Sequence, residues 1–180
     1  MKTIHERQRF HDTVKASAMQ YISEHANWHV DWRLTKYADD EAYERDNPFE
    51  IVDFKENLLA NAGITLLLTL LTGGAGTAYT NAVAYLGVGD SNTAASASQT
   101  DLQASSNKLR KAQDSTFPSV TNQTVKFQST FGSSDANFSW QEVGAFNAGS
   151  GGTMLNRKVQ DLGTKSSGAT WVLQLSITIS

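Results

Sequence analysis

His25 and His29 have the spacing closest to that of a metal site, because side chains four positions apart share one face of a helix. Zinc sites of the HExxH kind use this spacing, but the glutamate that acts as general base there is missing here. Asp90, Asn92 and Asp101 could offer oxygen ligands to calcium, yet the EF-hand spacing and its terminal glutamate are absent. We therefore expect no resident metal and no cofactor, with at most an adventitious ion, and we interpret the histidines as solvated.

Gly89-Asp90-Ser91 follows an apolar run, as the nucleophile block of some serine hydrolases does. A serine becomes a nucleophile when a histidine takes its proton and a carboxylate orients that histidine. In those hydrolases the histidine lies near the C-terminus, whereas no histidine follows His29 in this chain. The block is therefore interpreted as a turn in which Asp90 or Ser91 hydrogen-bonds to nearby backbone.

Asp135 and Glu142 flank an aromatic segment and could act as the two carboxylates of a glycosidase, which lie about 5–9 Å apart. Glu142, however, shares one face of an extended segment with Trp140. This favours a partly buried carboxylate paired with Arg110 or Lys126 over a catalytic one. No catalytic residue is predicted, and the protein is not expected to be an enzyme.

The composition argues against several kinds of partner. The chain has 180 residues and a net charge of −3, and its longest basic stretch is Lys108-Leu109-Arg110-Lys111. Nucleic-acid binding needs clustered lysine and arginine to neutralise phosphates, so none is expected. The longest apolar run, Ile64 to Leu71, is about half a membrane span, and the charged N-terminus does not resemble a signal peptide, so no membrane association is expected. The absence of cysteine excludes disulfides and thiolate metal sites.

The chain has two unlike parts. Residues 1–57 hold 8 of the 15 basic residues, 12 of the 18 acidic residues and all four histidines. Spacings of three and four predict a helix over about residues 4–25, with one face formed by Phe10, Val14, Ala18, Tyr21 and His25. Strict alternation predicts a strand over residues 28–34, with Trp28, Val30, Trp32 and Leu34 on one side. A second short strand is expected over residues 49–54, so residues 1–56 are predicted to form a helical and extended docking arm.

A second helix is predicted over about residues 57–72, ended by Gly73-Gly74. Apolar residues cover most of its circumference, and a helix of this kind is normally buried. We therefore expect residues 57–74 to form a buried helix and a glycine-rich linker.

Residues 75–180 are predicted to be strands and turns. Residues 83–88 form a short apolar run, residues 93–106 are small and polar like a long loop, and the segments 124–131, 138–146 and 171–179 alternate. Several such strands separated by glycine-rich turns are typical of antiparallel sandwiches. The predicted fold is therefore mainly β, an antiparallel, jelly-roll-like β-sandwich over residues 75–180, with the helical arm and the buried helix before it.

An ordered set of segments resembles a module of tailed-phage particle proteins. The segments are YLGVGDSNTAASASQTDL (85–102), NKLRKA (107–112), VKFQSTFGSSDANFSWQEVGAFNA (125–148), MLNRKV (154–159) and GTKSSGATWVLQLSITIS (163–180), and the lead-in ENLLANAGITLLLTLL (56–71) resembles theirs as well. Modules of this kind occur in tail fibre, baseplate and capsid-associated proteins. The resemblance covers roughly residues 56–180, and it implies a structural β-sandwich located in the virion.

Two groups of residues are candidates for partner binding. Trp28, Val30 and Trp32 would present two tryptophans on one strand face, and tryptophan is enriched at interface hot spots. The alternative is that they pack on the chain's own sandwich. The second group is the basic patch Lys108, Arg110 and Lys111, which could contact an acidic surface such as residues 39–44 of a neighbouring subunit.

Two functional classes remain. The first is a decoration or minor capsid protein that binds and stabilises the major capsid shell, since a protein that binds only the assembled shell favours that shell. The second is a tail fibre or baseplate adaptor, or a receptor-binding tail component. In either case we expect other virion proteins as partners, a homo-oligomer with a trimer as one candidate, and a location in the virion after assembly in the bacterial host cytoplasm.

Overall fold

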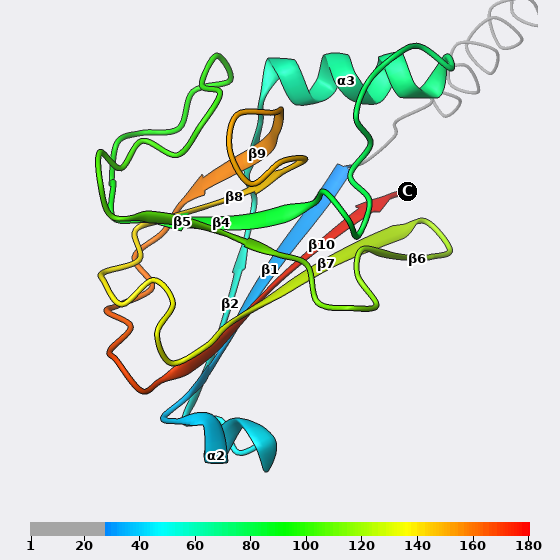
Figure 1. The fold of residues 1–180 in the computed structure, drawn as a ribbon. Helices are drawn as coiled ribbons and strands as arrows, with labels where there is room; N and C mark the ends of the chain where they lie inside the picture. The colour runs from blue at the N-terminus through cyan, green and yellow to red at the C-terminus, as the bar shows by residue number, and fades with distance from the viewer. Residues whose placement is uncertain (1–27) are drawn as a thin grey trace, which may run out of the picture.

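The computed structural model describes residues 28–180, so the predicted helix over residues 4–25 lies outside the described residues. The described chain is mainly β, with two five-stranded antiparallel sheets and few helices (Figure 1). The first sheet has the order β2-β1-β10-β7-β6, formed by Glu50–Lys55, Trp28–Tyr37, Thr170–Ile179, Thr124–Phe131 and Ser119–Thr121. The second has the order β3-β9-β8-β4-β5, formed by Leu58–Leu59, Met154–Val159, Glu142–Phe146, Tyr85–Gly89 and Lys108–Ala112.

The two sheets share one hydrophobic core, which gives a sandwich-like arrangement. The alternation in β1 turns Val30, Trp32 and Leu34 into this core, and Trp32 stacks on Phe54 of β2 with ring centroids 6.0 Å apart. The second sheet contributes side chains such as those of Leu86, Val88 and Val143. Burying large side chains from both sheets excludes water from the space between them, and this hydrophobic effect stabilises the fold.

The first sheet includes strands that the sequence assigned to a docking arm. β1 lies between β2 and β10, and all ten of its residues pair with β10, from Trp28 opposite Ile179 to Tyr37 opposite Thr170. The predicted strands at 28–34 and 49–54 are thus confirmed, but the boundary at residue 75 is wrong for the structure. The reason is that the backbone groups of β10 hydrogen-bond to β1, so the sandwich-like body already begins at Trp28.

The two helices found within residues 28–180 lie at opposite ends of the body (Figure 1). α2 (Asp40–Glu44) follows β1 within the acidic stretch, and the Asp39 side chain caps it by accepting a hydrogen bond from the Ala42 amide at 2.7 Å. α3 (Asn61–Leu71) lies near the start of β1 and the end of β10. Within residues 28–180 no helix has the length and apolar character required to span a membrane.

The expected burial of the second helix is wrong for the described chain. α3 is apolar on most of its circumference, yet Gly63 is its one buried residue, and Leu68 and Leu71 are 59% and 81% exposed. Its contact with the body is close but narrow: a Cβ atom on Gly63 would lie 2.7 Å from the carbonyl oxygen of Leu155. The helix therefore contacts the backbone of β9 closely at Gly63, and most of its leucines lie outside the core.

Candidate docking surface

An apolar groove lies between α3 and the adjoining ends of the first sheet. The volume of this open groove is about 720 Å³. We define the apolar groove by its lining residues, which are Trp28, Leu59, Ile64, Leu67, Leu68, Leu71, Val120, Asn122, Gln123, Thr124, Val125, Ile177 and Ile179. None of these described lining residues carries an ionisable side chain, so the groove is suited to an apolar surface rather than to a charged ligand.

The floor of the groove consists of residues from neighbouring strands of the first sheet, which the strand register places side by side. Trp28 of β1 pairs with Ile179 of β10, and Ile177 of β10 pairs with Val125 of β7. The same alternation that buries Ile177 leads to Ile179, but Ile179 is 47% exposed because the core ends before it. Val120 of β6, opposite Val125, is also exposed. The sheet thus continues its apolar face past the edge of the core.

α3 forms the opposite wall of the groove. Its first turn is held to β9, since the Ala60 amide donates to the Leu155 carbonyl at 3.0 Å. Leu67 packs against the core, whereas Leu68 and Leu71, further along the helix, remain exposed. Fully burying one leucine is worth about 1.5–3 kcal/mol, so a partner that covered this wall would gain substantial hydrophobic stabilisation.

The three residues of β1 that were predicted to bind a partner lie in different environments. Val30 and Trp32 are buried in the chain's own core, so their assignment to a docking face is corrected. The physical reason is the central position of β1, whose inner face is covered by the second sheet. Trp28, at the first position of the strand, is half-buried and lines the apolar groove.

The basic patch lies on β5, and its cations have partners within the chain. Lys108 and Arg110 both pair with Asp101, at 3.0 and 2.7 Å, and Lys111 pairs with Asp135 at 2.6 Å. The Arg110 guanidinium also lies over the Phe146 ring, 3.6 Å from its centroid. Binding of this patch to an acidic neighbour stays a prediction, and it would compete with these ion pairs.

The two carboxylates of these pairs are held in the charged form. Burial acts to raise the pKa of Asp135, but hydrogen bonds from Lys111 and the Gly132 amide outweigh it, so the pKa lies below its usual value. The pKa of Asp101 is lowered in the same way, because hydrogen bonds from Arg110 and Lys108 outweigh its burial. The three ion pairs that these two carboxylates form therefore persist at neutral pH.

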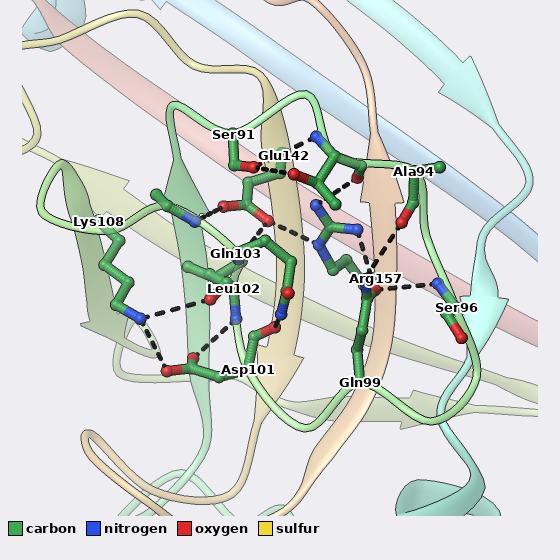
Figure 2. Close-up of polar contacts among 12 residues, drawn as sticks. Ser91, Ala94, Ser96, Gln99, Asp101, Leu102, Gln103, Lys108, Glu142 and Arg157 are labelled. Atoms are coloured by element: carbon green, nitrogen blue, oxygen red, sulfur yellow. Dashed lines mark hydrogen bonds and ion pairs between the residues drawn. The ribbon is translucent and has the colours of Figure 1, made fainter.

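Glu142 is fully buried and pairs with Arg157 of β9, not with Arg110 or Lys126 as expected. The Arg157 Nε donates to its carboxylate at 2.6 Å, and the amides of Gln103 and Ala104 donate to it at 3.0 and 2.8 Å (Figure 2). A Cβ atom at Gly89 would collide with this carboxylate, so the glycine of the Gly-Asp-Ser block makes room for it.

Arg157 also holds the long loop between β4 and β5. Its guanidinium donates to the Thr93 carbonyl at 2.9 Å and to the Gln99 side-chain oxygen at 3.0 Å (Figure 2). Glu142 binds the other end of the same loop, at Gln103 and Ala104. The buried pair thus fixes a polar loop at both ends, a role that the sequence did not indicate because its members are distant in the chain.

The remaining candidate residues have local roles in the described part of the chain. The Ser91 hydroxyl accepts a hydrogen bond from the Thr93 amide at 3.2 Å, so the predicted turn is confirmed. Asp90 accepts from the Asn107 side chain, and His29 is exposed on the outer face of β1. His25 lies outside the described residues. Within residues 28–180, no three His, Cys, Asp or Glu side chains are grouped so that they could hold a metal ion.

No protein-family model matches this chain, and no curated protein matches it at a significant level.

Proposed function

We propose that this chain is a non-enzymatic structural protein of a tailed-phage particle, and that it attaches to another protein of the particle through the apolar groove. The proposed location is the outer surface of the capsid, where the chain would act as a decoration or minor capsid protein. Binding to the assembled shell but not to free shell subunits would stabilise the shell by mass action.

The observation that carries this proposal is the wall of the groove, which the described residues 28–180 leave uncovered. A helix that is apolar on nearly all of its surface is normally buried, because exposed leucines favour association in water. α3 instead leaves Leu68 and Leu71 exposed, and Val120 and Ile179 face them from the sheet side of the groove. Such a surface suits a stable partner protein better than a small polar substrate.

The resemblance to phage modules supports the same proposal. Its segments include the strands β4, β5, β7, β8, β9 and β10, which supply strands to both sheets, and its lead-in includes α3. The residues that carry the resemblance thus include the second sheet, β7 and β10 of the first sheet, and the helical wall of the groove. A complete β-sandwich with a jelly-roll-like path, a virion location and a homo-oligomeric state belong to this proposal.

The test is incorporation of matched variants into particles of the phage that encodes the chain. Leu68→Asp places a charge in the groove, and Ile51→Asp places the same charge on β2 outside it, at residues of similar exposure, 59% and 53%. We expect the Leu68 variant to fold, with a cooperative thermal transition, but to be lost from purified particles, while the Ile51 variant is retained. Equal retention of both variants would contradict docking through the groove.

A further inference from the structure

We infer that in the free subunit the apolar groove is occupied by the chain's own N-terminal segment, residues 4–25. This inference rests on the proposed function in one respect, since it concerns the state of the docking surface before a partner arrives. The partner and the segment would then bind the same apolar groove, and docking of the partner would require the segment to leave the groove.

The two apolar surfaces match in length. The stripe predicted from the sequence runs from Phe10 to Tyr21, which is about 16 Å along a helix. α3, the wall of the groove, has 11 residues and is therefore also about 16 Å long. An amphipathic helix that lays its apolar stripe in a hydrophobic groove is a recurrent mode of recognition, with anchors at spacings of three and four.

The tether places the segment at the groove. β1 begins at Trp28, and Trp28 itself lines the groove. The three residues from His25 to Trp28 span at most about 10 Å, which is close to the 8–10 Å that separates the axes of packed helices. The end of the predicted helix is therefore always within reach of the groove, and this high effective concentration favours the chain's own segment over that of a second copy.

The chemistry of the two surfaces also agrees. The described lining residues of the groove are apolar or uncharged, as are Phe10, Val14, Ala18 and Tyr21 of the stripe. The charged residues Arg9, Asp12 and Lys15 lie on the other faces of this predicted helix and would remain in water, and Arg7, one turn before Phe10, marks the end of the apolar stripe. Covering the groove in this way would keep free subunits from associating through their exposed leucines.

Engineered cysteine pairs test the inference in the full chain, which has no cysteine of its own. Phe10→Cys, Val14→Cys and Ala18→Cys are each combined with Leu68→Cys in the groove. The matched control combines them with Ile51→Cys, which pairs with Thr35 near the far end of β1. A disulfide forms only when the two Cα atoms approach to about 4.4–6.8 Å.

We expect mild oxidation of dilute protein to give an internally crosslinked monomer for at least one Leu68 pair and for none of the Ile51 pairs. A covalent dimer would assign the groove to the segment of a second copy and overturn the inference. Equal crosslinking of the Leu68 and Ile51 pairs, or none at all, would overturn it as well.

A second readout uses trypsin, which cleaves after Lys15 within the segment. We expect Leu68→Asp to speed this cleavage about tenfold or more relative to the wild type, and Ile51→Asp to leave it unchanged, because cleavage follows the open population. Equal rates in all three proteins would contradict the inference. If the Leu68 cysteine pairs crosslink but Leu68→Asp is still incorporated into particles, only the proposal that the groove docks on a partner is refuted. If Leu68→Asp is lost from particles but no cysteine pair crosslinks, only the inference that residues 4–25 occupy the groove is refuted.

Discussion

Replacing Glu142 by glutamine keeps the volume of the side chain but removes the charge of the buried pair. The Arg157 guanidinium would then be buried without a counter-ion, since the two side chains are 0% and 1% exposed. One oxygen would also become an NH₂ group, which would face N–H donors from Gln103, Ala104 or Arg157. Breaking a buried ion pair by removing one partner costs about 3–5 kcal/mol.

This loss is large against the total stability of a domain, which is about 5–15 kcal/mol. For a chain of this size each kcal/mol shifts Tm by about 2–4 °C, so we expect Glu142→Gln to lower Tm by about 6–20 °C. Denaturant unfolding measures the free energy directly. Hydrogen exchange should show, in addition, that the amides of Gln103 and Ala104 lose protection before the rest of the body does.

The matched control is Asp53→Asn, which removes one charge from the exposed Arg33–Asp53 pair on the outer face of the first sheet. Its carboxylate is 58% exposed, and exposed pairs contribute about 0–1 kcal/mol. A Glu142→Gln protein no less stable than the Asp53→Asn protein would refute the conclusion that the buried pair holds the loop.

Three further changes test the core, the contact of α3 with β9, and an ion pair of β5. Trp32→Ala should lower the free energy of unfolding, measured by chemical denaturation, by about 3–5 kcal/mol, because Trp32 lies in the core. Trp28→Ala should lower it clearly less. The reverse order would contradict the placement of β1. Gly63→Ala should lower Tm, because overpacking against the Leu155 backbone costs about 1–3 kcal/mol. This cost outweighs the gain of about 1 kcal/mol in helix propensity that alanine brings. An unchanged or higher Tm would show that α3 can shift freely. Asp135 has a folded-state pKa below its usual value, so its stabilisation is complete above about pH 4 and is lost as pH falls through the folded pKa. The free energy of unfolding of Asp135→Asn, measured from about pH 6 to pH 2, should therefore fall less steeply with acid than that of the wild type, and parallel curves would exclude this contribution.

Strands buried on one face were predictable from the sequence. β7 and β10 alternate clearly, because one side of each strand packs on the core and the other does not. β9 was not predicted as a strand, since four consecutive residues from Met154 to Arg157 are buried and two of them are polar. β5 was not predicted either, because its charged side chains hide the pattern and are paired to partners distant in the sequence.

The candidate site was only partly predictable for a related reason. The apolar surface of α3 was evident from its composition, but the sequence could not reveal that residues 28–180 leave this surface uncovered. Likewise, the alternation of Trp28, Val30 and Trp32 identified one apolar face without showing that the second sheet covers it. Both outcomes depend on strand register and on contacts between distant segments, which local patterns do not determine.

The most direct test of the proposed role is the copy number of this chain in purified particles of the phage to which the proposal assigns it, measured by quantitative mass spectrometry against the major capsid protein. We predict hundreds of copies, as expected for a protein bound across the capsid surface. A small number set by the symmetry of the tail or portal vertex would contradict the capsid location and indicate a tail adaptor or fibre instead. Absence of the chain from the particles would contradict a structural role in the virion altogether.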